Sequence, residues 1–321
     1  MSRISSPSSS TRSISLVLLV VAVVGLGVIT GLYFMTSMPG RSYEGALAEL
    51  SGEARALSLH LRLHVAALAD RERNTDLETA ARYIEAAFGA GARSQAFESG
   101  GRTVRNIELG SGVIVVGAHY DSVPGSPGAD DNASGVAVLI ELARMNLPAR
   151  FVAFANEEMP YFLTDEMGSH AFAGRARRGG ERIAAMLSLE MLGFYRDAPR
   201  SQRYPPPLGL IYPDRGDFVA FVGDLGARRL LRRSVELFRA HAKFPSEGVA
   251  APSFIPGVTW SDHWSFRRHG YPAIMVTDTA FYRNPHYHLP SDTPEKLDYA
   301  RMARVTLGLA ALIKELAHEN R

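Results

Sequence analysis

Five short segments of the chain place acidic and histidine side chains in patterns that could bind metal ions. They are His119-Tyr120-Asp121-Ser122, Asp131 in PGADDNASG, Asn156-Glu157-Glu158, Glu190 in MLSLEML, and His286 with His288 in a proline-rich loop. The chain contains no cysteine, so imidazole and carboxylate groups are the metal ligands left to it. Together these side chains predict a site for two zinc ions, with a free carboxylate beside them.

The first two segments also have a purely structural interpretation. His119 follows the apolar run VIVVGA, and a lone histidine there is more often a hydrogen-bonding group than a ligand. Asp121, two residues later, could hold its imidazole in one tautomer from outside the metal site. Asp131 or Asn132 could simply cap the following helix, whereas the two carboxylate oxygens of Asp131 could also bridge a pair of metals.

The three glutamates are harder to explain without a function. Glu157 and Glu158 could be a solvated surface pair, but they follow the buried run FVAFA, where a carboxylate must find a partner. One of them could bind metal while the other moves protons. Glu190 interrupts an apolar strand, so it must be neutral, be paired in a salt bridge or bind a cation. The sequence alone leaves these possibilities open.

The elements between these segments predict an α/β fold. Apolar runs at 113–118, 151–155, 186–192, 208–212 and 272–276 read as strands, with shorter strands near 94–97 and 103–109. Helical periodicity covers 43–88 in two segments, then 133–145, 168–178, 227–242 and 296–318. This alternation predicts a three-layer sandwich, in which helices cover both faces of a central, mainly parallel mixed sheet. Ligands of such folds gather where strands end.

The start of the chain differs from the rest. Residues 14–35 carry no charge, and at about 1.5 Å per residue a helix of that length crosses a bilayer. Arg3 and Arg12 precede it, so the positive-inside rule predicts a cytoplasmic serine-rich tail over 1–13 and an extracytoplasmic domain over 43–321. A cleaved signal peptide is the alternative, but the apolar stretch is long for one. We therefore expect a single-pass membrane anchor, with the catalytic domain in the periplasm or outside the cell.

The composition excludes several other classes. The chain has 321 residues, 46% of them hydrophobic, and 35 basic against 33 acidic side chains give a net charge of +2. Such a composition is globular, and the near-neutral charge argues against a nucleic-acid partner. The lack of cysteine excludes disulfides, thiol catalysis and iron–sulfur clusters. Nothing in the sequence indicates an oligomeric state.

Taken in order, GAHYDS, PGADDNASG, NEE, SLEMLG and YHLPSDT resemble the motifs of the co-catalytic zinc aminopeptidases. This is the metallopeptidase family of the bacterial leucyl aminopeptidases and glutamate carboxypeptidase II, and the resemblance covers about residues 57–315. It implies a zinc-dependent exopeptidase of the aminopeptidase type, which hydrolyses the N-terminal residue of peptides.

The resemblance also implies a role for each site residue. His119 and Glu190 would bind one zinc, Glu158 and His288 the other, and Asp131 would bridge both and precede a cis peptide bond. Glu157 would be the general base and Asp121 the partner of His119. His288 is preferred to His286 because of its distance from Asp292-Thr293. The family often has Asp at the position of Glu190, so another divalent metal could replace zinc there.

Further residues are expected at the substrate. Trp260-Ser261-Asp262-His263 resembles the family's SDH segment, which places Asp262 and His263 near the substrate pocket, although a helix N-terminus explains the same pattern. Tyr282 and Tyr287 are candidate substrate contacts, and the loops 196–207 and 244–258 could wall the pocket.

Two other functions fit the same motifs. A glutaminyl cyclase-like acyltransferase would use a related scaffold with a single zinc. An inactive, membrane-anchored binding protein would have lost ligands or the general base, and this chain retains all six of those residues.

Overall fold

The chain divides into two units after Ser37. The computed structural model describes residues 9–320, and side chains from residue 18 onward, so residues 1–8 of the predicted tail lie outside the described part. One unit ends at Ser37, and the other, here called the main unit, begins at Met38. Its start precedes Tyr43, the predicted first residue of the domain, because the chain from Met38 onward already packs against the core.

The first unit is dominated by helix α1 (Ser9–Thr36). Its segment Leu18–Thr36 has a mean hydropathy of 2.4, and none of it is buried inside the protein. The predicted apolar helix is therefore present, and it is long and apolar enough to cross a membrane. Signal sequences near an N-terminus share these properties.

The main unit is built around one sheet of eight strands. The strands are β1 (Arg93–Ser99), β2 (Arg102–Gly110), β3 (Ile114–His119), β4 (Arg150–Phe154), β5 (Ala185–Glu190), β6 (Val219–Asp224), β7 (Ser246–Ala251) and β8 (Ala273–Thr277). They lie in the order β1-β2-β4-β3-β5-β8-β6-β7. The central strands β4, β3, β5 and β8 run parallel, whereas β1, β2 and the β8–β6 pair are antiparallel. The predicted mixed, mainly parallel sheet is confirmed.

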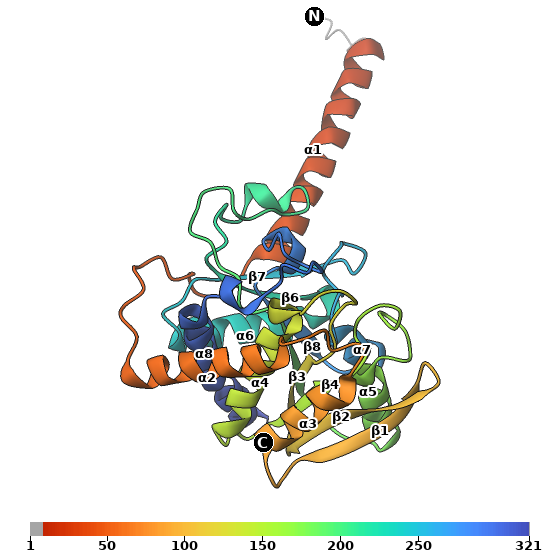
Figure 1. The fold of residues 1–321 in the computed structure, drawn as a ribbon. Helices are drawn as coiled ribbons and strands as arrows, with labels where there is room; N and C mark the ends of the chain where they lie inside the picture. Colours follow the sequence, from red (N-terminus) through yellow and green to blue (C-terminus); the bar gives the residue numbers. More distant parts are fainter. Residues whose placement is uncertain (1–8, 321) are drawn as a thin grey trace, which may run out of the picture. The chain divides into compact units, whose positions relative to one another are not determined.

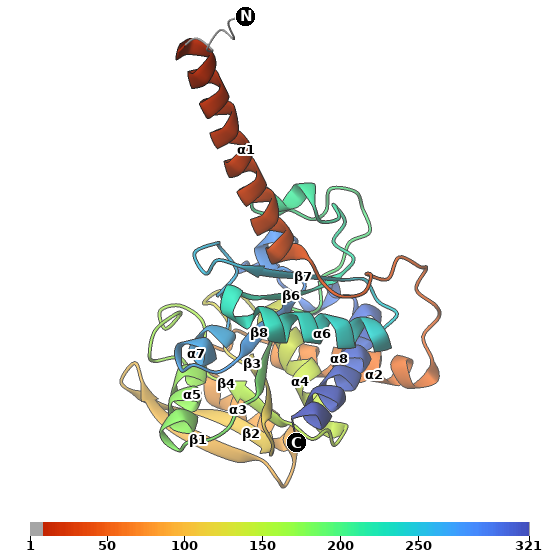
Figure 2. The same cartoon turned by 180° about the vertical axis from the view of Figure 1, so that it is seen from behind.

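Helices cover both faces of this sheet. They are α2 (Gly52–Leu68), α3 (Leu77–Phe88), α4 (Gly135–Arg144), α5 (Gly168–Arg178), α6 (Arg228–His241), α7 (His263–Arg268) and α8 (Tyr299–Glu319). The larger core lies between one face and helices α2, α3, α4, α6 and α8, while a smaller core lies under α5 and α7. Figures 1 and 2 show this arrangement, with α6 and α8 side by side in both views. The predicted three layers are therefore confirmed.

Strand β3 shows why the sequence folds in this way. All six of its residues are buried, with Val116 in the larger core and Val115 in the smaller one. Successive side chains of a strand point to opposite faces, so a strand covered on both sides must be apolar throughout. Gly117 is small because the Phe154 ring fills the adjacent space, and a Cβ there would lie 2.2 Å from Phe154 Cε2. The backbone pairing of β3 with β4 places His119, the last residue of β3, opposite Phe154.

Two parts of the sheet differ from the prediction. Residues 208–212, expected as a strand, contain a short 3₁₀-helix at Leu208–Leu210, and Leu210 is 90% exposed. This segment follows three prolines, and proline lacks the backbone N–H group that pairing in a sheet requires. Strands β6 and β7 were not predicted. The β7 sequence SEGVAA, within the expected 244–258 loop, is short and contains a glycine and a glutamate, which are infrequent in strands.

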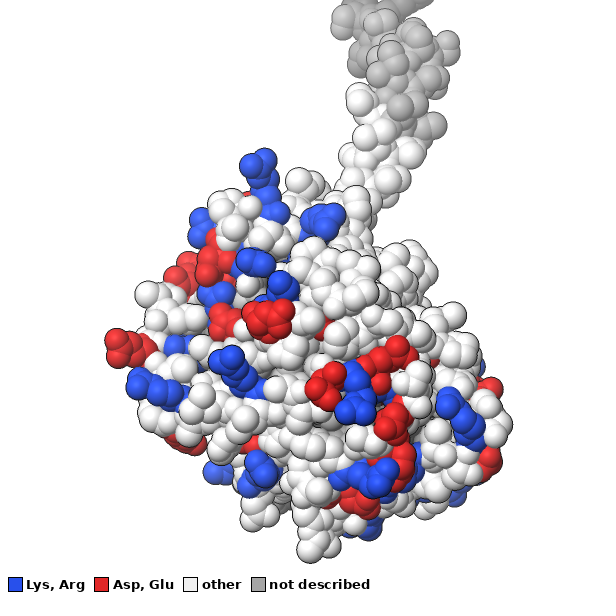
Figure 3. Space-filling view, in the orientation of Figure 1, with Lys and Arg blue, Asp and Glu red and all other residues white. Residues whose placement is uncertain are grey.

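Charged side chains are interspersed on the face shown in Figure 3, where basic and acidic groups lie next to one another. Among the ion pairs of the main unit, Arg105 pairs with Glu78 and Glu85 at N···O distances of 3.0 and 2.8 Å. Such mixed pairs keep a surface soluble without creating a patch of one sign.

Candidate metal centre

The predicted ligands meet at the carboxyl ends of the central strands. His119 ends β3 and Glu190 ends β5, while Glu157 and Glu158 follow β4 after a short turn. Asp131 comes from the irregular turn Ala129–Ser134 that leads into α4. All five side chains belong to residues that are at most 6% exposed. The register of three parallel strands therefore determines where the acidic groups collect.

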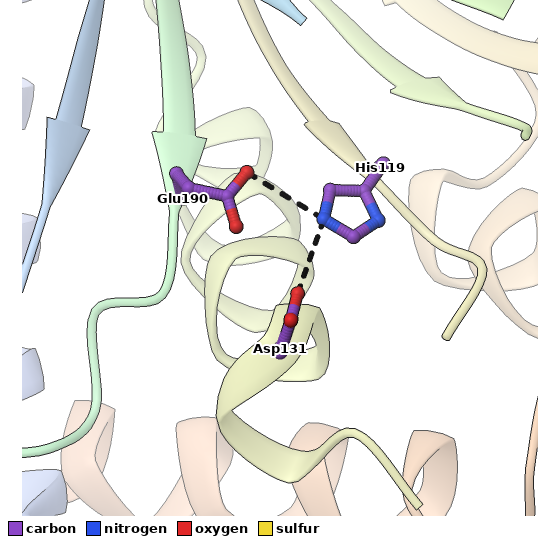
Figure 4. A group of neighbouring side chains, drawn as sticks. All are labelled: His119, Asp131 and Glu190. Atoms are coloured by element: carbon purple, nitrogen blue, oxygen red, sulfur yellow. Dashed lines mark ion pairs between the residues drawn. The ribbon is translucent and has the colours of Figure 1, made fainter. Parts of the chain in front are cut away.

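The ligands form two groups that share Asp131. In the first group, drawn in Figure 4, His119 Nε2 lies 3.3 Å from Asp131 Oδ1 and 3.5 Å from Glu190 Oε2. In the second, His288 Nε2 lies 3.0 Å from Asp131 Oδ2 and 3.4 Å from Glu158 Oε2. Within each group the potential ligand atoms lie within 4.8 Å of one another. Asp131 thus presents one carboxylate oxygen to each group.

The hydrogen bonding of these groups is incomplete in a way that suits a cation. Both ring nitrogens of His119 and the Oε1 atom of Glu158 are buried without a hydrogen-bond partner in the described structure. A buried polar atom without a partner costs about 1–3 kcal/mol, so an arrangement of this kind needs a compensating ligand. Imidazole nitrogens and carboxylate oxygens are suitable zinc ligands. The residues present therefore fit the metal that this type of site implies.

The electrostatics of the site point in the same direction. Burial, together with the nearby charge of Asp131, raises the pKa of Glu158 to about 7. Burial likewise raises the pKa of Glu157 and Glu190 above the ordinary range. Burial also opposes ionisation of Asp131, but the neighbouring imidazoles outweigh it and lower its pKa. Several carboxyl groups compete for few positive charges, and a divalent cation would favour their ionised forms.

Asp121 connects two of the ligand segments. Its Oδ1 and Oδ2 atoms accept hydrogen bonds from the backbone N–H groups of Glu157 and Glu158, at 3.1 and 2.8 Å. Its Oδ1 atom also lies 3.4 Å from His119 Nδ1, the ring nitrogen that faces away from Asp131. The carboxylate therefore lies where the sequence predicted it, beside His119, and it also holds the turn after β4, which the sequence did not indicate.

The turn that carries Asp131 is held by side chains from distant segments. Asp292 accepts hydrogen bonds from the backbone N–H groups of Asp130 and Asp131 at 3.0–3.1 Å. The side chain of Asn132 donates to Leu189 O at 2.8 Å and accepts from Met191 N at 3.0 Å, on either side of Glu190. The Asp131–Asn132 peptide bond is cis, as the resemblance implies. Asp292 and Asn132 are site residues whose roles the sequence did not reveal.

The two histidines of the proline-rich loop have different surroundings. His288 faces Asp131, its side chain is 33% exposed, and its ring stacks on Tyr287 with centroids 3.7 Å apart. His286 turns away and its Nδ1 atom lies 2.9 Å from Ser291 Oγ in an exposed position. The structure therefore places His288, and not His286, among the candidate ligands.

The SDH segment, residues 261–263, is buried and contacts the ligand Glu190 through Ser261. Ser261 donates a hydrogen bond of 2.7 Å to Glu190 Oε2 and so orients that carboxylate, a role that the sequence did not predict. Asp262 and His263 are 0% and 1% exposed, and neither lines the cavities beside the site. His263 instead contacts Val258 O through Nε2 at 2.9 Å. The structure thus does not bring these two residues to a substrate-accessible surface.

Two adjoining cavities open at the site. One of about 650 Å³ is lined by Glu157, Asp131, both ligand glutamates and His288. A second of about 870 Å³ shares Glu190, Trp260 and Tyr287 with the first. Its walls are mostly apolar and come from the segments 202–212, 218–222, 247–258 and 275–282, which include Tyr282. Parts of both loops that were expected to wall a pocket therefore do so.

An eight-stranded α/β sheet with this arrangement of acidic residues defines a class of metal-dependent hydrolases, and comparison with known proteins identifies the family. Residues 102–313 match the model of peptidase family M28, and the chain belongs to that family. It is 42% identical to the uncharacterized protein YfbL of Escherichia coli (strain K12) over 74% of this chain and 80% of that protein. It is 28% identical to a probable leucine aminopeptidase of Arthroderma otae over 72% of this chain and 62% of that protein.

Solved structures agree on the fold. LapB from Legionella pneumophila matches with a TM-score of 0.64 and 21% identity over 90% of this chain and 80% of its own. The glutaminyl cyclase of Fimbriiglobus ruber matches with a TM-score of 0.56 and 18% identity, over 86% of this chain and 99% of its own. At these identities the likeness concerns the fold. The family assignment confirms the prediction of a peptidase, a hydrolase of peptide bonds.

Replacement of Asp121 by Asn should destabilise the main unit. An amide oxygen can accept one of the two backbone N–H groups, but the NH₂ group faces the other and leaves it unpaired. We expect the free energy of unfolding of the metal-free protein to fall by about 1–3 kcal/mol in urea titrations. Asp165→Asn, at a side chain that is 85% exposed, is the control and should change it by less than about 0.5 kcal/mol. Equal effects of the two changes would contradict the role assigned to Asp121.

Proposed function

We propose that the chain is a zinc-dependent aminopeptidase that removes the N-terminal residue of peptides. The observation that carries this proposal is the position of Asp131, whose two carboxylate oxygens face two separate ligand groups beside Glu157. A shared carboxylate of this kind matches the two-metal sites of hydrolases. Membership of family M28 supports the reaction class, and the leucine aminopeptidases among the relatives support the aminopeptidase type.

We assign one zinc to His119, Glu190 and Asp131, and the other to Glu158, His288 and Asp131. When bound, a metal pair supplies Lewis acidity that polarises the peptide carbonyl and makes water a stronger nucleophile. Glu190 in place of the family's more usual Asp is accommodated by the hydrogen bond from Ser261, which fixes one oxygen of the longer side chain. The same oxygen, Oε2, lies 3.5 Å from His119 Nε2, so the bond from Ser261 orients the Glu190 carboxylate toward the first ligand group.

Glu157 is the proposed general base. Its side chain lines the smaller cavity, its residue is 5% exposed, and its Oε2 atom lies 4.0 Å from His119 Nε2. It therefore borders the metal site without belonging to either ligand group. Burial raises its pKa, which makes it a better proton acceptor than an exposed glutamate. In the reaction Glu157 accepts the proton of the attacking water and delivers it to the leaving amine.

The larger cavity fits the side chain of the first substrate residue. It adjoins the ligands at Glu190, and its apolar walls include Phe218, Phe221 and Met275. Burial of an apolar side chain yields roughly 25 cal/mol per Å² of apolar surface, so these walls favour large apolar residues at the substrate N-terminus. Tyr282 and Tyr287, at the walls, are the proposed substrate contacts. Asp262 and His263 are too deeply buried to be retained in that role.

A glutaminyl cyclase-like activity is the second candidate, because the cyclase of Fimbriiglobus ruber shares the fold. The five proposed ligands in two groups favour a site for two metals over a site for one. A binding protein without activity is disfavoured because Glu157 and four of the five ligands line the cavity, and the fifth, His119, lies 3.3 Å from Asp131.

We further propose that α1 anchors the enzyme in a membrane, with the main unit outside the cytoplasm. The support is the apolar segment Leu18–Thr36 and the preceding arginines, Arg3 and Arg12, which favour a cytoplasmic N-terminus. The side chains of those two arginines lie outside the described part of the structure.

A panel of aminoacyl chromophores with free and acetylated N-termini tests the reaction type. We expect cleavage of the free Leu and Phe substrates, little cleavage of Asp, and none of the acetylated forms. Metal analysis of the same preparation should give two zinc ions per chain. Equal cleavage of acetylated substrates would refute the aminopeptidase assignment, and one zinc with cyclisation of N-terminal Gln would establish the cyclase instead.

Glu157→Gln tests the general base. The amide has nearly the same shape but cannot accept the proton, so kcat should fall by about 10²- to 10⁴-fold while the zinc content is unchanged. The matched control is Glu98→Gln, an exposed position on β1, which should retain the activity. Full activity of the Glu157 variant would remove this residue from the mechanism.

Fractionation of cells that produce the full chain tests the anchor. The protein should stay in the membrane pellet after washes with high salt and alkaline carbonate, because a spanning helix resists both. Its mature N-terminus, read by sequencing, should precede residue 14. A soluble protein that starts after residue 35 would show that α1 is a cleaved signal sequence.

A further inference from the structure

Arg73 is a buried cation that neither the sequence motifs nor the proposed mechanism uses. It lies between the end of α2 and the start of α3, and it is 2% exposed. Among the described residues, no carboxylate side chain lies within ion-pair distance of its guanidinium. Burial of an arginine is costly, so the contacts that replace its hydration indicate what it stabilises.

The guanidinium is satisfied by backbone carbonyls. Its Nε atom donates to Tyr120 O at 2.7 Å, and Nη1 donates to Pro127 O at 2.7 Å and Leu68 O at 3.1 Å. Its Nη2 atom lies within hydrogen-bond distance of three further carbonyls, those of Gly128 at 3.0 Å and of Asp121 and Asp131 at 3.3 Å. One side chain thus joins the end of α2, the segment after β3 and the turn before α4.

The segments that Arg73 joins carry the site. Tyr120 and Asp121 directly follow His119, and the carbonyl of Asp131 belongs to the residue whose carboxylate faces both ligand groups. On its other side, the backbone N–H of Asp131 is held by Asp292 at 3.1 Å. The main chain of Asp131 is therefore fixed by an acceptor at its N–H and a donor at its C=O.

The surrounding backbone closes tightly on Arg73. Its own N–H donates to Ser122 Oγ at 3.0 Å, and Ser122 Oγ donates to Ser126 O at 3.2 Å within the same loop. Gly128 has a φ of +61°, and a Cβ there would lie 2.8 Å from Arg73 Nη2 and 2.2 Å from Asp131 O. Such close approach leaves little room for the guanidinium to move. The loop and the arginine side chain therefore hold each other in one conformation.

We propose that Arg73 is a positioning residue that sets the distance between His119 and Asp131. It thereby keeps the first ligand group in the geometry that binds zinc. This inference rests on the proposed zinc centre. Lysine could not substitute for it, because one ammonium group has three donors at a single point, whereas the planar guanidinium directs five donors from three nitrogens.

Charge and position predict opposite effects for Arg73. Its positive charge lies near the carboxylates of Asp121, Asp131 and Asp292, and a cation there repels a bound metal. If charge alone mattered, Arg73→Met would strengthen zinc binding and Arg73→Lys would leave it unchanged. If positioning dominates, both variants weaken it.

The test is the zinc affinity of the full chain, measured by competition with a chelator at constant pH. We expect Arg73→Lys and Arg73→Met to weaken zinc binding by about 10- to 100-fold, the usual effect of changing groups that orient ligands. The visible spectrum of the Co²⁺-substituted Arg73→Lys protein should also change, because it reports ligand geometry. Unchanged affinity in Arg73→Lys, or stronger binding in Arg73→Met, would overturn the proposal.

Arg283→Lys is the matched control. Arg283 is also buried, at 4% exposure, but it donates to Gln202 Oε1 and Phe194 O, away from the carbonyls of the ligand segments. It should lower the unfolding temperature yet leave zinc affinity within about threefold. An equal loss of affinity in this control would mean that general destabilisation, and not positioning, explains the effect.

Two further measurements separate failure of the positioning proposal from failure of the variants to fold and from failure of the metal centre itself. If the Arg73 variants do not fold, Ser122→Ala removes the acceptor of the Arg73 N–H, and it should weaken zinc binding in the same direction. Unchanged affinity in that variant would count against the proposal. A wild-type chain that binds no zinc would refute the proposed metal centre itself, a result distinct from equal binding by wild type and variants.

Discussion

The crowding of buried carboxylates around Asp131 is the constraint on which the rest of the main unit depends. A carboxylate inside a protein must be neutral, paired or bound to a cation. Here three glutamates and Asp131 share two imidazoles, and the pKa of Glu158 is raised to about 7. This arrangement is stable only because strands, turns and hydrogen bonds from distant segments keep the ligands in place. The fold is therefore organised to hold negative charge at one edge of the sheet.

Much of this organisation could be predicted from the sequence. The apolar run before His119 and the one before Glu157 each require a strand that is buried on both faces, and parallel strands bring such residues to one edge. Glu190 was conspicuous because it is a charge in an apolar strand. The choice of His288 over His286 came only from the resemblance, through the distance to Asp292-Thr293, since two histidines separated by one residue in a loop carry no periodic signal; the structure also places His288 beside Asp131.

The residues that sequence reasoning missed act through the backbone. Arg73 binds carbonyls, Asp292 binds N–H groups, and Asn132 does both on either side of Glu190. Backbone groups are the same in every residue, so their partners leave no pattern in the sequence. The sequence of β7 predicts a loop for a different reason. Its residues have low strand propensity, and pairing with β6 stabilises it in the folded chain.

The origin of the walls of the larger cavity has a consequence for how such an enzyme can diversify. The ligands stand at the ends of central strands, whereas much of the wall comes from the connecting segments 202–212 and 252–258. Connecting segments tolerate substitution and changes of length far better than buried strands do. Preference for one substrate residue over another can therefore be altered by exchange of loops, while the hydrolytic apparatus is inherited intact.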